Sequence, residues 1–149
     1  MTGDDLYPYW ASVHEEYVDF LLAVSSEELS RRVAGAGASI QTLVVRSAVE
    51  ERFLTGSVIL RNPLDPINVG DYADAPSLIE LLKATRHQTE RALAPLTPAG
   101  LRSVRTLPAN PAVNQHEANV TINWIVWKIM QIEIEAYSMV KLRWKDLGH

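Results

Sequence analysis

The chain has 149 residues, of which 47% are hydrophobic, and a formal net charge of −4. This length and composition predict one globular domain, residues 1–149, with a core that needs no metal or disulfide. The sequence has no cysteine, which excludes disulfides, thiol nucleophiles and thiolate metal sites. It has no cluster of lysine and arginine, so nucleic acid is not an expected partner. No stretch reaches the length of a membrane span and no signal-peptide pattern opens the chain, so we expect a cytoplasmic protein that does not enter a membrane.

The first long helix is predicted from Asp4 to Val24. Asp4 and Asp5 suit a first helical turn, because carboxylates there complement the helix dipole. Apolar residues then recur every three or four positions, which is the spacing of one helical face. His14 follows the first of them by four residues and therefore shares this face, whose members are Trp10, Val13, Tyr17, Leu21 and Val24.

The next elements are marked by capping residues. Ser25 and Glu28 have the spacing of a capping box, which predicts a short helix over about 26–32. Ser39 is a good N-cap for a second long helix that ends before Gly56. The apolar face of this helix extends to a glutamate, and its members are Ile40, Leu43, Val44, Ser47, Ala48 and Glu51.

A long connection, 57–75, separates this helix from the third. Prolines, a glycine and several aspartates make the segment a loop that crosses one end of the helices. Asp74 or Ser77 begins the third long helix, which runs to Leu93. A further helical turn is predicted over 97–101, where a proline takes the favoured first position.

The last long helix, 119–144, follows a second long connection over 103–118. Asn119 or Thr121 can cap its start, and Gly148 offers a stop. Its predicted buried face is the longest in the chain: Ile122, Ile125, Ile129, Ile132, Ala136, Met139 and Val140. A second apolar line widens this surface: Trp124, Trp127, Ile134 and Tyr137. We find no convincing strand. Four long helices with two long connections and short extra helical turns predict an all-α fold, a four-helix bundle.

Two segments carry a resemblance to a known family. The segment ASIQTLVVRSAVEERFL, 38–54, and the segment TINWIVWKIMQIEIEAYSMVKL, 121–142, are similar to the second and last helices of the DinB-like superfamily. The branch concerned contains mycothiol-dependent transferases and maleylpyruvate isomerases. Glu51 matches the glutamate of its second helix, and Thr121 and Trp124 are in register with its last helix. The resemblance implies a DinB-like bundle that forms a homodimer.

The positions that hold the family's metal are replaced. In relatives a histidine on the second helix and two side chains four residues apart on the last helix bind the ion. The corresponding residues are Arg46, Ile132 and Ala136. Isoleucine and alanine have no donor atoms, and arginine is a permanent cation that repels a divalent metal. We therefore expect no metal site and no cofactor, and the grounds for transferring the family's metal-dependent thiol chemistry are lost.

The leading hypothesis is a metal-independent protein that binds a small organic molecule in the bundle cavity and catalyses a cyclisation, an isomerisation or another proton transfer. Arg46 would hold an anionic or carbonyl oxygen, and His14 or Glu133 would move a proton. The cavity would be lined by Trp10, Tyr17, Glu50, Ile132, Ala136 and Tyr137. Structural roles compete with these assignments, because Arg46 can pair with Glu50 at the surface and His14 can be a hydrogen-bonded core residue.

Two alternatives stay open. One is a metal- and thiol-dependent S-transferase with a non-standard metal site. The other is a non-catalytic, dimeric interaction protein in which side chains fill the former cavity and the aromatic face of the last helix makes the contact. The sequence identifies neither a substrate nor a reaction.

Overall fold

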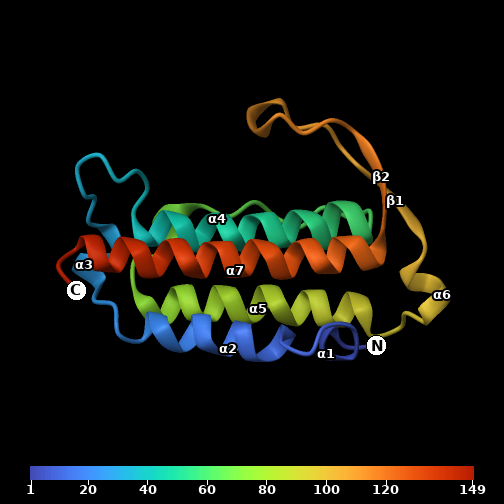
Figure 1. Cartoon of the computed structure of the whole chain (residues 1–149), viewed down its shortest axis with the longest axis horizontal. Helices are drawn as coiled ribbons and strands as arrows, with labels where there is room; N and C mark the ends of the chain where they lie inside the picture. Colours follow the sequence, from blue (N-terminus) through green and yellow to red (C-terminus); the bar gives the residue numbers. More distant parts are fainter.

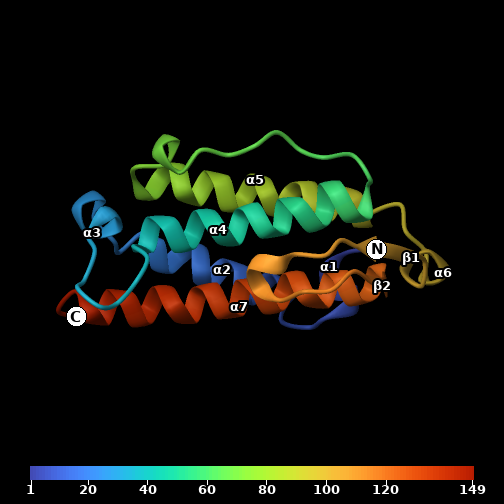
Figure 2. The same ribbon diagram turned by 90° about the horizontal axis from the view of Figure 1, so that it is seen from above.

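The computed structural model describes residues 1–149, with the exception of the side chain of Val113. Its body consists of four long helices that lie side by side: α2 (Trp10–Leu21), α4 (Ile40–Arg52), α5 (Ala75–Leu93) and α7 (Ile122–Asp146). Helix α4 packs against α5 and α7, and α2 packs against the same two helices (Figures 1 and 2). Each long helix therefore has two long neighbours, and the core lies between the four. The chain is mostly helical, as the periodicity predicts.

The predicted capping residues begin the helices. Ser25 forms a capping box with Glu28 ahead of α3 (Ser26–Ser30). The side chains of Ser39 and Asp74 accept hydrogen bonds from backbone amides at the starts of α4 and α5. Thr97 and Thr121 do the same for α6 (Pro98–Leu101) and α7. Each cap satisfies an amide that has no partner within its own helix, which is why these sequence signals identify the starts correctly.

The prediction of one continuous helix from Asp4 to Val24 is wrong, because the helix is interrupted. The chain forms a short helix, α1 (Gly3–Leu6), and α2 begins only at Trp10. Pro8 lies in the break. Proline lacks the amide hydrogen and clashes with the preceding turn, so it separates the two helices rather than sitting inside one.

The second predicted helix does not end before Gly56. It continues from α4 into a π-helix, η1 (Phe53–Ile59). A β-carbon on Gly56 would lie 2.9 Å from Leu64 Cγ and 3.1 Å from the carbonyl oxygen of Asn62. The glycine therefore allows the following loop to cross close to the helix, and it does not act as a stop signal.

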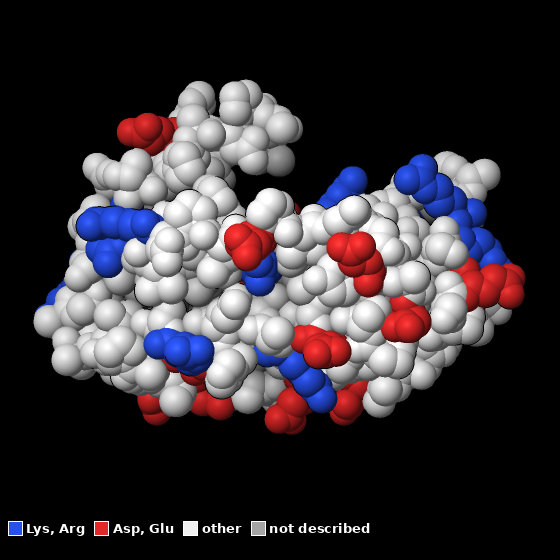
Figure 3. Space-filling view, turned by 180° about the vertical axis from the view of Figure 1, so that it is seen from behind, with Lys and Arg blue, Asp and Glu red and all other residues white. Residues whose placement is uncertain are grey.

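The prediction that the chain has no strand is also wrong. Strands β1 (Val104–Leu107) and β2 (Ala118–Thr121) pair antiparallel, with Val104 opposite Thr121. Together with the turn between them they form a hairpin arm, residues 104–121, that stands out from the helices (Figures 1 and 3). Four residues are too few to display a clear alternation, so neither strand has a recognisable pattern in the sequence.

The core has two groups of buried apolar residues. One group includes Tyr17, Val44, Leu78 and Val140, and the other includes Trp10, Leu54, Leu93, Ile125 and Ile129. Each long helix carries one inward-facing ionisable residue between members of the two groups. The predicted face of α7 is buried except for Ala136, which is half-buried, and Met139, which is 40% exposed. The two apolar groups therefore enclose a polar layer, described below.

The outer surface mixes acidic and basic side chains, and on the face in Figure 3 neither sign forms a continuous patch. Within the part of the chain that the structure describes, no helix combines the length and the apolar composition that a membrane crossing requires.

Candidate functional site

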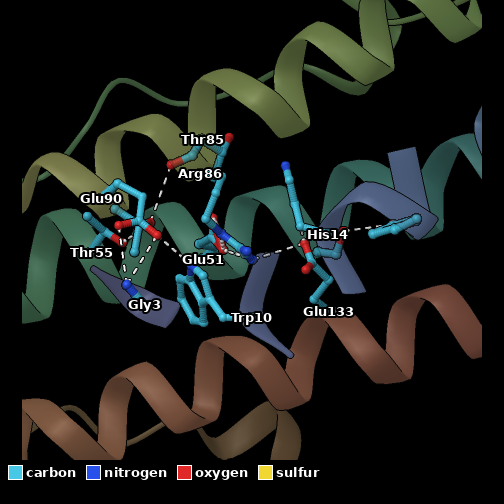
Figure 4. A network of polar contacts seen from close by, with 12 residues as sticks. Gly3, Trp10, His14, Glu51, Thr55, Thr85, Arg86, Glu90 and Glu133 are labelled. Carbon is cyan, nitrogen blue, oxygen red and sulfur yellow. Dashed lines mark hydrogen bonds and ion pairs between the residues drawn. The ribbon is translucent and has the colours of Figure 1, made fainter. Parts of the chain in front are cut away.

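Four ionisable side chains, one from each long helix, meet between the helices (Figure 4). They are His14 on α2, Glu51 on α4, Arg86 on α5 and Glu133 on α7, and we call them the charge cluster. Arg86 Nη2 lies 2.9 Å from Glu51 Oε1 and 3.0 Å from Glu133 Oε2. His14 Nδ1 lies 2.7 Å from the same Glu133 oxygen. The cluster is thus a continuous chain of contacts, His14 to Glu133 to Arg86 to Glu51.

The cluster is buried. The side chains of Arg86 and Glu51 are each 8% exposed and that of Glu133 is 7% exposed, whereas His14 reaches 13%. Arg86 also donates from Nε to Glu51 Oε1 over 3.1 Å and to Oε2 over 3.4 Å, so three hydrogen bonds join this pair. Charges at such a depth are costly unless they are paired and hydrogen-bonded. His14 is the member of the cluster closest to solvent.

The electrostatic effects within the cluster oppose one another. Burial raises the pKa of Glu51, and the neighbouring Arg86 guanidinium lowers it by a smaller amount. Burial lowers the pKa of Arg86, but the carboxylates of Glu51 and Glu133 together raise it by a larger amount. The net shift of this pKa is therefore upward. Arg86 therefore stays a cation, and its charge is what makes two buried carboxyl groups tolerable.

The aromatic ring of Trp10 supports Arg86. The guanidinium carbon lies 4.1 Å from the centre of the Trp10 ring, a favourable cation–π geometry. Trp10 Nε1 in turn donates to Glu90, which also accepts from the backbone amide of Gly3. A β-carbon at position 3 would lie 2.2 Å from the Trp10 ring. Helix α1 can therefore pack this closely against the tryptophan only because residue 3 is glycine.

A small cavity adjoins the cluster. Its volume is about 10 Å³, and its lining is Ser47, Ala48, Glu51, Leu82, Thr85, Ile129, Ile132 and Glu133. Sites for drug-sized molecules have volumes of roughly 300 to 1,000 Å³. The expected cavity for an organic molecule between the helices is therefore not present at this position.

Of the three residues predicted to do chemistry, the structure brings two together. His14 and Glu133 share the short contact described above, whereas Arg46 is exposed. The expectation that Arg46 points into the interior is wrong. Helix α4 buries Val44, Ser47 and Glu51, which recur at intervals of three and four, and Arg46 falls between these positions on the outer side of the helix.

The arginine of the interior is Arg86, which sequence reasoning missed. A usable signal existed, because Arg86 follows the inward-facing Leu82 by four residues and therefore lies on the same face of α5. Glu51 was placed on the buried face of its helix and as the family's glutamate, but without a role in the site. Its partner, Arg86, could not be predicted from the sequence, because the pairing depends on how α4 and α5 are rotated about their axes.

The residues predicted to line a substrate cavity fall in different environments. Trp10 and Tyr17 are buried, Tyr17 donates or accepts a hydrogen bond with Ser47 over 3.0 Å, and its ring stacks on Tyr137. Glu50 is exposed and lies outside the charge cluster. Ile132 lines the small cavity, while Ala136 and Tyr137 are half-buried against the core. They do not surround one common space.

The metal implied by the family resemblance does not fit these residues. Arg46 is exposed, and Ile132 and Ala136 have no donor atoms. In the described part of the chain, no three histidine, aspartate or glutamate side chains are grouped in a way that could hold a metal ion. Within the charge cluster it is the Arg86 guanidinium that lies between the two carboxylates.

The sequence was compared with protein-family models and with curated proteins, and neither comparison gave a match. The DinB-like resemblance therefore rests on the sequence motifs alone.

Within the charge cluster, His14 and Glu133 have the geometry of a pair that can transfer protons. A carboxylate that accepts from one imidazole nitrogen fixes the orientation and tautomer of the ring, and it stabilises the imidazolium that forms when the ring takes up a proton. Among the described residues, the hydrogen bond at Nδ1 is the one that His14 makes, so Nε2 keeps its capacity to give or take a proton.

Proposed function

We propose that the protein is a metal-independent four-helix bundle of the DinB-like type, whose His14 and Glu133 transfer protons to and from a small organic molecule. The observation that supports this function best is the 2.7 Å contact between His14 Nδ1 and Glu133 Oε2. The reaction class is an isomerisation, a cyclisation or another step in which a proton is removed at one atom and returned at another.

The contacts of the cluster assign a role to each member. Glu133 orients His14, and Arg86 holds Glu133 in place from the opposite side. Because Arg86 already pairs with two carboxylates, it is a positioning residue and not an anion-binding one. The substrate would approach Nε2 from the solvent side of His14, since the cavity of about 10 Å³ on the inner side admits no organic molecule.

We expect a thermal-shift screen of small carboxylic and carbonyl metabolites to give compounds that stabilise the wild-type protein. His14→Gln should weaken their binding by about tenfold or more, which corresponds to about 1.4 kcal/mol, because the substitution removes the ring nitrogen that faces the ligand. His116→Gln is the matched control, since His116 is exposed on the hairpin arm. A screen without any stabilising compound would contradict the proposal, and so would equal binding by wild type and His14→Gln.

A second candidate is a non-catalytic protein that acts as a homodimer. The narrow interior favours it, and so does a line of exposed apolar residues on the last helix. Trp127, Ile134 and Leu142 recur at intervals of seven and eight along α7 and are 39%, 43% and 51% exposed. Exposed apolar lines of this kind are typical of surfaces that pair with another chain.

Light scattering tests the second candidate. We expect a dimer at micromolar concentrations and a monomer for Ile134→Glu, because a carboxylate buried in the contact would lack a partner. Leu22→Glu is the control, since Leu22 is 70% exposed on a different helix and its replacement should leave the dimer intact. A wild-type protein that is monomeric throughout this range would rule out the homodimer.

A further inference from the structure

The small cavity beside the charge cluster is bounded by polar atoms that lack partners. Thr85 Oγ1 and Glu133 Oε1 are both buried, and neither has a hydrogen-bond partner among the described protein atoms. Both residues belong to the cavity lining. Arg86 Nη1, in the adjoining guanidinium, is a third buried atom without a protein partner. Three unpaired polar atoms thus concentrate in one part of the interior.

Leaving these groups unpaired would be costly. A buried polar atom without a hydrogen bond has lost its hydration without compensation, and the loss is larger for a charged oxygen than for a neutral one. Thr85 is 2% exposed and Glu133 is 6% exposed, so bulk solvent does not reach their unpaired oxygens. Another group within the cavity has to satisfy them.

The cavity volume determines the size of that group. About 10 Å³ is close to the space that a single water molecule requires. In the remaining wall, Ser47 and Glu51 already pair with Tyr17 and Arg86. The other lining residues are apolar, so a larger polar molecule would find no further partners there: Ala48, Leu82, Ile129 and Ile132. A calcium or magnesium ion would need six or more oxygen ligands, and the Arg86 guanidinium beside the cavity would repel any divalent cation.

We propose that the cavity holds one internal water molecule, which donates a hydrogen bond to Glu133 Oε1 and shares a second with Thr85 Oγ1. A threonine hydroxyl donates or accepts as required, so the two partners are compatible with one water. Both oxygens of Glu133 are then held, Oε2 by His14 and Arg86 and Oε1 by the water. The carboxylate that orients His14 is thereby fixed on both sides.

This inference is independent of the proposed chemistry. Glu133 faces His14 and Tyr17 from α2, Glu51 from α4 and Arg86 from α5. The water completes the hydrogen bonding of this buried group whether or not His14 acts on a substrate. Loss of ligand binding in His14→Gln and loss of the water in a Thr85 variant are therefore separate outcomes.

The test is a high-resolution crystal structure of the full chain, combined with water-to-protein nuclear Overhauser effects in solution. We expect one solvent peak at roughly 2.7 to 3.2 Å from both Thr85 Oγ1 and Glu133 Oε1. Thr85→Val, which keeps the shape but removes the hydroxyl, should lose the peak, and Thr85→Ser should retain it. Thr89→Val is the matched control, because the Thr89 hydroxyl is equally buried one turn away but pairs with Thr55.

Three results would overturn the inference. The wild-type cavity could be empty at high resolution, with the Thr85 hydroxyl turned to a backbone carbonyl. The peak could persist unchanged in Thr85→Val, which would mean that the hydroxyl does not hold it. It could also show metal-like distances of about 2.0 to 2.6 Å to several oxygens, which would identify a cation. If Thr85→Val does not fold, the wild-type and Thr85→Ser structures still decide the question.

Discussion

Replacing Arg86 by methionine is expected to lower the free energy of unfolding by about 3 to 5 kcal/mol, because it leaves charged partners buried without a counter-charge. Methionine keeps much of the volume of the side chain but removes the guanidinium that lies 2.9 Å from Glu51 and 3.0 Å from Glu133. A loss of this size is a large part of the total stability of an ordinary domain, which is about 5 to 15 kcal/mol. Chemical denaturation followed by circular dichroism measures it.

Arg46→Met is the matched control for this substitution. Arg46 is an exposed arginine on α4 with no ion pair within the described residues, so its replacement should change the stability by no more than about 0.5 kcal/mol. The double variant Arg86→Met with Glu51→Gln should recover part of the loss, since one of the two uncompensated carboxylates is then neutral. Equal and small effects of Arg86→Met and Arg46→Met would show that the charge cluster contributes little to the fold.

Replacing Trp10 by alanine is expected to cost about 3 to 5 kcal/mol, the range for removing a large aromatic side chain from a core. Trp10 is 2% exposed, and its loss removes the ring beneath Arg86, the hydrogen bond to Glu90 and the surface on which Gly3 packs. Because the ring supports Arg86, the effects of Trp10→Ala and Arg86→Met should not add.

Trp127→Ala serves as the comparison for Trp10→Ala. Trp127 is 39% exposed on α7, and its ring centre lies 6.1 Å from that of Trp124, so we expect a loss of about 1 kcal/mol or less. A double-mutant cycle between Trp10 and Arg86, measured by urea denaturation, would report their interaction energy directly. If Trp10→Ala and Trp127→Ala cost the same, or if the Trp10 and Arg86 effects are strictly additive, the supporting role of Trp10 is wrong.

Local sequence signals predicted much of the helical framework. Ser25 and Ser39 cap the helices that they were expected to begin. Where two caps were considered, the structure selects Asp74 for α5 and Thr121 for α7. These signals work because a cap acts on amides two or three residues away. The same kind of reasoning failed at Pro8 and Gly56. There the outcome depended on whether proline falls inside or before a first turn, and on a loop that packs against the glycine.

Sequence reasoning identified only part of the candidate site. His14 and Glu133 were named as candidates for proton transfer, and the structure places them in contact. The choice of Arg46 over Arg86 failed because each is one of several arginines in a helical segment, and only the rotation of the helix decides which points inward. The family resemblance did not help here, since it assigned Arg46 to a position whose side chain is exposed.

The sequence by itself determined the helical class, the starts of the main helices, the absence of cysteine chemistry and the lack of donor atoms at the family's metal positions. All of these depend on residue identity or on neighbours within one helical turn. Only the tertiary structure decided that His14, Glu51, Arg86 and Glu133 form one buried cluster and that the space beside them is no larger than a water molecule. The physical reason is that each contact joins two helices, so it depends on their relative rotation and axial position, which are set by the packing of the whole core.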